Sequence, residues 1–320
     1  MSRATKIWVL AASAMILLGL LIFGGAMMAL KWDFLKLSTG KYQTSTHEIT
    51  EAFGGIAINT DTAQIMLAVG EGEACTVVCH EREKVTHSVA VKDGTLVIES
   101  VDARKWYEHI GFDFGTPKIT VYVPQGVYGA LQIRSSTGDI EVSKELAFES
   151  MDIKVSTADV KNSARVLGNM KIKANTGDIF VENTAAGALD LSVSTGKVSV
   201  SSVQCAGDVA VSVSTGKTSL SDLVCKSVTS SGDTGDISLK NVVATGSFSI
   251  ERSTGDVHFD RCDAASLVIK TSTGDVTGSL LSEKVFFAKT DTGKVEVPKT
   301  ATGGSCEIIT DTGDIRISIN

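Results

Sequence analysis

The chain has 320 residues, of which 43% are hydrophobic and only 3 are proline, and its formal net charge is −7. This length and composition allow a substantial core in one or two domains, and they exclude a disordered chain and a collagen-like one. Without the basic Arg3, Lys6 and Lys31, the rest of the chain has a net charge of −10, which makes it a poor binder of nucleic acid.

The N-terminal stretch from Ile7 to Leu30 contains no charged residue. At about 1.5 Å per residue, a helix of this length spans a hydrocarbon core of roughly 30 Å. Arg3 and Lys6 precede it without an acidic residue, so the positive-inside rule leaves the N-terminus in the cytoplasm and places the rest outside. A cleavable signal peptide has a shorter apolar core, of about 7–15 residues. We therefore favour an uncleaved, single-pass cell-membrane anchor in residues 1–31, in contact with the lipid bilayer through residues 7–30.

A polar connector is expected over residues 32–52 and an irregular β region over residues 53–134. The second region contains strand-like alternation in the segments GIAIN, AQIMLAV, CTVVCH, SVAVKDGTLVIES and KITVYV, and Asp93-Gly94 is a hairpin signal. No convincing amphipathic helix follows residue 31. We expect this region to cap the domain that comes after it.

Six cysteines and five histidines are spread along the chain. Cys75, Cys79 and His80 suggest a metal site, but a strand places His80 on the face opposite to the two cysteines, and no second ligand pair follows. A disulfide between Cys75 and Cys79 stays open for an exported protein. We expect neither a metal nor a cofactor. The other cysteines lie in or near apolar positions and are interpreted as buried small hydrophobic residues: Cys205, Cys225, Cys262 and Cys306.

The segment 102–118 interrupts the β pattern with four aromatic residues, in a chain that is only 6% aromatic: Trp106, Tyr107, Phe112 and Phe114. Such a loop is suited to contact a glycan, an envelope protein or the membrane surface. The alternative is that it folds over the first coil as a cap, because the ends of a solenoid have to be covered. We favour the cap and keep the four aromatic residues as a candidate partner-contact loop.

Ten copies of a Thr-Gly-Asp turn, or a near match to it, then recur at steps of 19 or 20 residues. Ala158 replaces the glycine in the second copy, and lysine replaces the aspartate in three copies. A fixed period of about 20 residues is typical of stacked supersecondary units. The copies begin at Thr137, Thr157, Thr176, Thr195, Thr215, Thr234, Thr254, Thr273, Thr292 and Thr312.

Apolar residues alternate with polar ones on both sides of each turn, as in Leu131 and Ile133 before it and Ile140 after it. This period of two predicts at least two strands per unit, each with one buried face. Glycine permits the positive φ of a sharp corner, and aspartate can accept bonds from nearby backbone N–H groups. We predict an all-β fold with a single-stranded parallel β-solenoid (β-helix) of about ten coils over residues 135–320, roughly 48 Å long at about 4.8 Å per coil. An antiparallel meander has the same inward pattern and stays open as an alternative.

The serial motifs SSTGDIEVS, ANTGDIFVE, RSTGDVHFD and TSTGDVTGS, together with the N-terminal membrane segment, resemble the bacterial putative-adhesin β-strand repeat family. This is a cell-envelope domain of unknown function. The resemblance covers about residues 53–320. It implies a surface location and a β-solenoid, and it carries over no catalytic residue.

Catalytic interpretations of the repeat are weaker than structural ones. Asp-Thr-Gly at Asp233, Asp291 and Asp311 also occurs in aspartic proteases, where two carboxylates share a proton, but here the aspartate takes a slot that holds Ser or Asn in other copies. The ladder of turn aspartates offers oxygen ligands for Ca²⁺, but the lysines interrupt it. We expect a protein that is not an enzyme.

Three functions follow from these features. The favoured one is a membrane-anchored extracytoplasmic surface protein with adhesin-like binding or an envelope-stress-associated role, whose partner is an envelope protein or a glycan. The second is a structural, self-assembling solenoid scaffold, and the third is a carbohydrate-active β-helix enzyme, which needs a carboxylate cluster or cation site on one outer face.

The sequence is still in strand alternation at its C-terminal end, with Ile315, Ile317 and Ile319 on one side. An exposed last strand offers unpaired N–H and C=O groups to a neighbour. We therefore predict a weak homodimer through the C-terminal coil, at the strand that ends at Ile319.

Overall fold

A computed structural model describes residues 2–33, 41–109 and 115–320 of the chain. Its one long helix, α1 (Arg3–Ala29), begins at Ser2, whose hydroxyl accepts a hydrogen bond from the N–H of Thr5. The stretch Thr5–Ala29 is long and apolar enough to cross a membrane, and the 18-residue window that meets this test has no buried residue. A membrane anchor and a signal sequence both meet this description.

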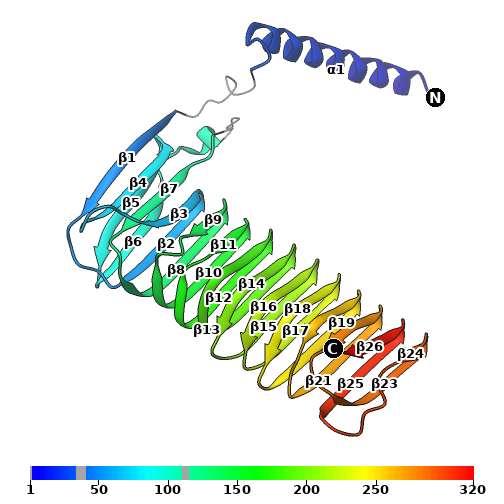
Figure 1. The fold of residues 1–320 in the computed structure, drawn as a ribbon. Helices are drawn as coiled ribbons and strands as arrows, with labels where there is room; N and C mark the ends of the chain where they lie inside the picture. The colour runs from blue at the N-terminus through cyan, green and yellow to red at the C-terminus, as the bar shows by residue number, and fades with distance from the viewer. Residues whose placement is uncertain (1, 34–40, 110–114) are drawn as a thin grey trace.

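Most of the remaining described residues form a β-solenoid in which the strands of successive coils lie side by side in parallel (Figure 1). The parallel pairing excludes the antiparallel meander and confirms the predicted solenoid. The first row of strands contains, in spatial order, β6 (Thr95–Asp102), β2 (Gly55–Thr62), β8 (Val127–Thr137), β10 (Ala147–Thr157), β12 (Arg165–Thr176), the second half of β13 (Ile179–Thr195), β15 (Val209–Thr215), β17 (Val228–Thr234), β19 (Ser247–Thr254), β21 (Ser266–Thr273), β25 (Gly304–Thr312) and β23 (Lys284–Thr292).

The strands of a second row come after those of the first row in each coil, in most coils directly after the Thr-Gly corner. In spatial order it contains β7 (Lys118–Val123), β3 (Gln64–Val69), β9 (Ile140–Val142), β11 (Val160–Asn162), the first part of β13, β14 (Val198–Cys205), β16 (Thr218–Cys225), β18 (Ile237–Ala244), β20 (Val257–Cys262), β22 (Val276–Leu280), β26 (Ile315–Ile319) and β24 (Val295–Glu296). Thr62 pairs with Thr137 in register, so the coil of β2 and β3 adds one more corner of the same kind to the ten predicted from the repeat.

Glycine is needed at these corners because the corners stack closely on one another. A Cβ built on Gly216 would lie 1.8 Å from the carbonyl oxygen of Gly196 in the coil before it. Nine corner glycines also have φ between +115° and +152°, where other residues are strained. The repeated Thr-Gly is therefore a geometric requirement of the stack.

The aspartate after the corner glycine connects one coil to the next. All seven aspartates at this position accept a hydrogen bond at Oδ1 from the backbone N–H of the equivalent residue in the neighbouring coil, at 2.7–3.3 Å. Lys197 donates its N–H to Asp178 but offers no carboxylate to the next coil. Because one oxygen of each carboxylate is engaged in this way, the aspartate ladder has a structural role that needs no Ca²⁺.

A second corner comes seven residues after the threonine. Five residues there have φ near +50°: Asn183, Ser202, Asp222, Asn241 and Arg261. The inward positions shift at this point, so that Val198 and Val200 are buried before Ser202, and Val203 and Cys205 are buried after it. Each coil therefore turns around one continuous apolar core, which includes stacked Phe248 and Phe259 with ring centroids 6.3 Å apart.

All six cysteines are buried as free thiols, as the apolar positions of four of them predicted. No disulfide connects Cys75 and Cys79. Burial raises the pKa of Cys225 to about 12 and that of Cys262 to about 11. These thiols act as small apolar groups of the core.

The order of coils in space departs from the order in sequence at both ends. At the C-terminal end, β25 lies between β21 and β23, and β26 lies between β22 and β24 (Figure 1). At the N-terminal end, β2 lies between β6 and β8, and β3 lies between β7 and β9. The expectation that the strand ending at Ile319 is an exposed edge is therefore wrong, because β26 is paired on both sides.

Antiparallel strands complete the N-terminal end of the solenoid. β4 (Cys75–Arg82) pairs with β7, β1 (Tyr42–Ile49) pairs with β4, and β5 (Val85–Lys92) pairs with β6. A short 3₁₀ helix, η2 (Trp106–His109), follows β6. We call this the proximal end, because it follows α1 in the chain, and the end formed by β23 and β24 the distal end.

Candidate functional sites

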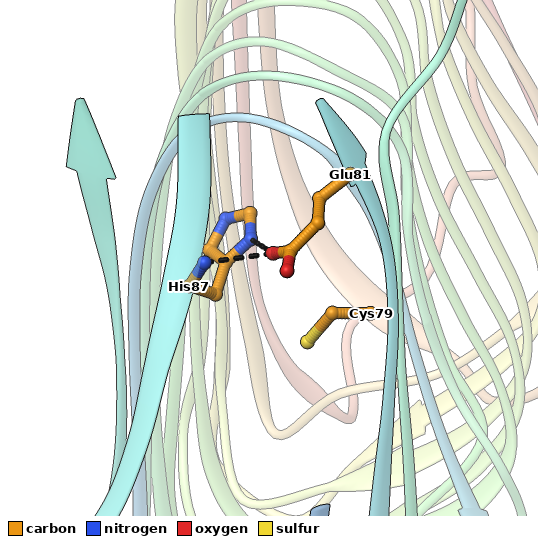
Figure 2. A group of neighbouring side chains, drawn as sticks. All are labelled: Cys79, Glu81 and His87. Atoms are coloured by element: carbon orange, nitrogen blue, oxygen red, sulfur yellow. Dashed lines mark hydrogen bonds and ion pairs between the residues drawn. The ribbon is translucent and has the colours of Figure 1, made fainter. Parts of the chain in front are cut away.

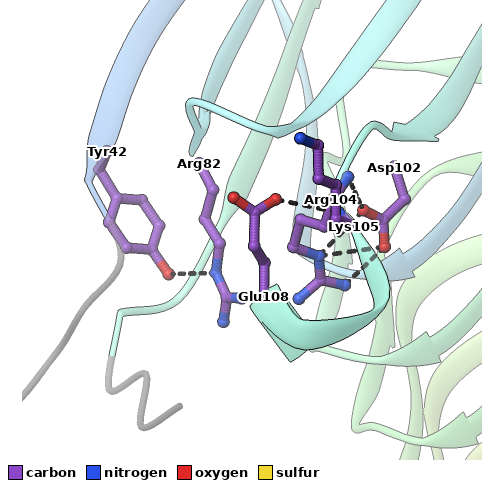
Figure 3. A network of polar contacts seen from close by, with 6 residues as sticks. All are labelled: Tyr42, Arg82, Asp102, Arg104, Lys105 and Glu108. Atoms are coloured by element: carbon purple, nitrogen blue, oxygen red, sulfur yellow. Dashed lines mark hydrogen bonds and ion pairs between the residues drawn. The ribbon is translucent and has the colours of Figure 1, made fainter. Parts of the chain in front are cut away.

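The polar segment after β6 has internal contacts, from Arg104 to Asp102 and from Lys105 to Glu108 (Figure 3), and an ion pair attaches it to the turn between β4 and β5. Lys84, in the turn between β4 and β5, pairs with Glu108 of η2, and the Lys105 N–H donates to the same carboxylate at 2.9 Å. The hydrogen bond from Lys84 and that from the Lys105 backbone lower the pKa of Glu108. Arg104 pairs with Asp102 at 2.6 Å. These contacts hold η2 against the turn between β4 and β5.

The predicted partner-contact loop lies only partly within the described residues. Trp106 begins η2 and is 80% exposed. Tyr107 belongs to the same helix. Phe112 and Phe114 lie outside the described residues. The attachment of η2 to the proximal strands is compatible with the cap interpretation, and the role of the four aromatic residues as a contact site stays a prediction.

A second group of polar residues is buried inside the proximal end (Figure 2). Cys79 and Glu81 project inward from β4, and His87 projects inward from β5, with relative exposures of 0%, 2% and 6%. Their candidate ligand atoms all lie within 4.8 Å of one another. We call these three residues the Cys–Glu–His cluster.

Hydrogen bonds hold two members of this cluster in place. The Oε2 of Glu81 lies 2.9 Å from His87 Nδ1 and accepts the backbone N–H of His87 at 2.7 Å. The Oε1 of Glu81 accepts the hydroxyl of Ser45, on β1, at 2.9 Å. The second ring nitrogen of His87, Nε2, lies 2.9 Å from the hydroxyl oxygen of Thr60 on β2. The cluster therefore joins three proximal strands to the first coil.

The series of Thr60, His87 and Glu81 has the order of a hydroxyl–imidazole–carboxylate triad. Thr60 is only 5% exposed, however, and its hydroxyl lies in the interior with the other two side chains. A substrate has no access to it, so we interpret this series as a positioning network.

Of the cluster, only Cys79 was considered as a ligand from the sequence, together with Cys75 and His80, and that metal site was not predicted. His80 does project from the opposite face of β4, as predicted, where its ring stacks on Tyr42 with centroids 5.2 Å apart. The missed signal is Glu81, a charged residue in an inward position of the alternation Cys75, Val77, Cys79. The hairpin between β4 and β5 then brings His87 to it.

The Asp-Thr-Gly turns do not form a proteolytic site. Asp291 and Asp311 lie on neighbouring strands at the same register, but both are exposed. Asp291 also pairs with Lys289 at 2.9 Å. A shared proton needs two carboxylates that are shielded together, and these are solvated turn residues.

The distal end leaves part of the core uncovered. Val295 of β24 occupies a column in which Val276 and Ile315 are 0% exposed, yet Val295 itself is 43% exposed. In the part of the chain that the structure describes, β23 pairs only with β25 and β24 only with β26. Phe287, on the outer face of β23, is 64% exposed. We call Val285, Phe287, Val295 and the free edges of β23 and β24 the distal surface.

Comparison with known proteins places these features in a family. The model of the Toastrack DUF4097 family matches residues 53–211 and 204–320. No curated protein matches the chain.

Solved structures are similar to the chain over most of its length. A putative adhesin from Parabacteroides merdae ATCC 43184 is 14% identical, has a TM-score of 0.50, and the alignment covers 88% of this chain and 98% of that one. A putative lipid binding protein from Parabacteroides distasonis ATCC 8503 is 16% identical, has a TM-score of 0.49 and covers 75% of this chain and 98% of its own. A putative adhesin from Bacteroides fragilis NCTC 9343 is 16% identical, with a TM-score of 0.44 and coverage of 88% and 99%. At these identities the likeness concerns the fold alone.

Proposed function

The chain belongs to the Toastrack DUF4097 family, and from this premise we propose that it is a membrane-anchored, extracytoplasmic and non-catalytic surface protein that binds an envelope protein through its distal surface. The apolar helix α1, with its basic N-terminal flank, supports the anchor and the orientation. The adhesin names of two similar solved structures accord with a binding role.

The observation that carries the proposal is the exposure of Val295 in a column that is buried in the neighbouring coils. Free strand edges beside exposed apolar side chains are the elements of β-strand addition, in which backbone hydrogen bonds supply affinity and side-chain contacts supply specificity. The free edges of the proximal end are different, since β1 is mostly polar, with the sequence YQTSTHEI. A glycan has no backbone to pair with such an edge, which favours a protein partner.

Site-specific photocross-linking of the full-length protein in its native envelope tests this proposal. A photoreactive phenylalanine analogue at Phe287 is compared with the same analogue at Val224. Val224 is a matched control, because it is 53% exposed but lies on β16, which is paired on both sides by β14 and β18. We expect a discrete adduct with another protein at position 287 and none at position 224. No adduct at 287, or the same adducts at both positions, contradicts the proposal.

The same experiment distinguishes a second candidate, the structural scaffold. Two copies related by a two-fold axis would pair their distal edges and give an adduct of twice the mass of the chain. In this candidate function the homodimer forms through β23 and β24, and not through the strand that ends at Ile319. Because the polar proximal end does not match this surface, pairing of this kind closes at a dimer and does not build a fibre.

The membrane anchor has its own test. Intact cells are treated with a protease, and the protection of a tag before Arg3 is compared with that of a tag after the last residue. We expect only the N-terminal tag to be protected, and the protein to remain in the membrane fraction after an alkaline wash. Release of the protein into the soluble fraction would indicate that α1 is removed as a signal sequence.

A further inference from the structure

Neither the family nor the distal surface explains why a thiol, a carboxylate and an imidazole are buried together in the proximal end. We propose that the Cys–Glu–His cluster, together with His47, is a binding site for one divalent transition-metal ion of the Zn²⁺ class. The site would join strands β1, β4 and β5, and it is independent of the proposed binding function.

The donor set selects the class of metal. Thiolate and imidazole ligands suit Zn²⁺ and similar first-row ions, whereas Ca²⁺ and Mg²⁺ require oxygen ligands. Ligands bound tetrahedrally to Zn²⁺ at about 2.0–2.3 Å lie roughly 3.3–3.8 Å apart. The three candidate atoms already lie within 4.8 Å of one another, so small side-chain rotations close the site.

An orphaned imidazole nitrogen supplies the second, independent observation. The Nε2 atom of His47 is buried and has no hydrogen-bond partner among the described residues. His47 lies on the inward side of β1, and its register partner Val77 is two residues from Cys79 on β4. Diagonal neighbours of this kind have Cα atoms about 7–8 Å apart, within reach of a histidine ring. Only the other three side chains have candidate ligand atoms within 4.8 Å of one another, so the ring of His47 has to rotate toward Cys79 to become the fourth ligand of a Cys-Glu-His₂ set.

Charge also favours an ion at this position. Burial of a carboxylate without a compensating charge is costly. A divalent cation with one thiolate, one carboxylate and two neutral imidazoles makes a site with no net charge. The buried Glu81 then has a counter-ion as well as hydrogen bonds.

The hydrogen bonds around the cluster orient the ligands as an outer shell does in metal sites. For Nδ1 of His87 to bind the metal, the proton of the ring has to lie on Nε2, from which it is donated to the oxygen of Thr60. The thiol proton of Cys79 is released to solvent when the metal–sulfur bond forms.

Cobalt substitution of the full-length protein in detergent tests the site. The protein is first treated with a chelator and then titrated with Co²⁺, and the absorbance is recorded from the near ultraviolet to the visible. We expect about one ion per chain, visible bands of tetrahedral Co²⁺, and a near-ultraviolet sulfur-to-cobalt band, as in tetrahedral sites with a cysteine ligand. Zn²⁺ should displace the Co²⁺ and abolish these bands.

Variants assign the ligands. Cys79→Ser should remove the sulfur-to-cobalt band, whereas Cys75→Ser should keep it; Cys75 is the matched control because it is also buried and faces inward from β4. His47→Gln should weaken binding at least 10-fold, and Thr60→Val about 10-fold, as for outer-shell partners. Circular dichroism establishes that each variant is folded.

The wild-type measurement alone can refute the proposal, even where a variant fails to fold. Wild-type protein that binds no Co²⁺, or binds it without a sulfur band, overturns the site. The same sulfur band in folded Cys79→Ser and in wild type does so as well. A Zn²⁺-induced rise in melting temperature that occurs in wild type and Cys75→Ser but not in Cys79→Ser supports it.

Discussion

Three double-cysteine variants test the order of the last three coils, using outward positions at one register. In the structure Val268 pairs with Glu307, and Glu307 pairs with Phe287, so β25 lies in the middle. Neighbouring strands are about 4.8 Å apart, so positions two strands apart are separated by roughly 9.6 Å. A disulfide requires Cα atoms within about 7 Å. The variant V268C/E307C should therefore cross-link under mild oxidation, and V268C/F287C should not.

The third pair, E307C/F287C, is the positive control, because these strands are neighbours whether the coils follow the order in space or the order in sequence. Cross-links are read from mobility on non-reducing gels and from mass spectrometry of the proteolytic peptides. The V268C/E307C disulfide closes a loop of about 40 residues and should stabilise the fold by up to about 4 kcal/mol on the chain-entropy model. A cross-link in V268C/F287C and none in V268C/E307C would refute the placement of β25 between β21 and β23.

Three further predictions concern stability and reactivity. Phe248→Ala should lower the free energy of unfolding by about 3–5 kcal/mol, because the side chain is fully buried, whereas Phe287→Ala on the surface should change it by less than about 0.5 kcal/mol; denaturant titration measures both. Asp256→Ala removes the acceptor of the Asp275 N–H and should cost about 1–2 kcal/mol in the same assay, with Asp256→Asn closer to wild type because its amide oxygen still accepts. Burial raises the pKa of the Cys225 thiol from 9.0 to about 12 in the folded protein. Its contribution to stability is therefore complete below pH 9 and is lost as the pH rises through 12. The melting temperature should fall between these two pH values, and the native protein should be alkylated slowly at this thiol.

The body of the solenoid could be predicted from its sequence because each coil repeats the same local requirements. Ile140 and Val160 lie in an inward column that their spacing from the threonine predicts, and they are buried and in register. A strict period also implies that equivalent residues stack in parallel. The corner Thr62-Ala63-Gln64 was not predicted, because it lacks both the glycine and the aspartate that mark most other copies.

The order of the terminal coils could not be predicted, because the repeat makes the coils interchangeable. Val295 and Ile315 occupy equivalent positions, and either of them satisfies the column that contains Val276. Local propensity is the same in both arrangements, so the choice depends on long-range packing. The Cys–Glu–His cluster was missed for a different reason: its residues are brought together across a hairpin, and each alone fits an ordinary strand.

The placement of β26 between β22 and β24 should slow the opening of β26, which hydrogen exchange can measure. A terminal strand that pairs on one side frays easily, because one ladder holds it and its free end gains conformational entropy. β26 avoids this by pairing on both sides: the Ile315 N–H donates to Lys294 on one side, and the Asn320 N–H donates to Leu280 on the other. The exposed edge strand of this row is β24, which is connected to the chain at both of its ends. We expect the amides of β26 to exchange at least about 10-fold more slowly than those of β24, since opening β26 requires about 1.4 kcal/mol or more in additional hydrogen bonds. Equal exchange in the two strands would show that the C-terminal strand is not clamped between its neighbours.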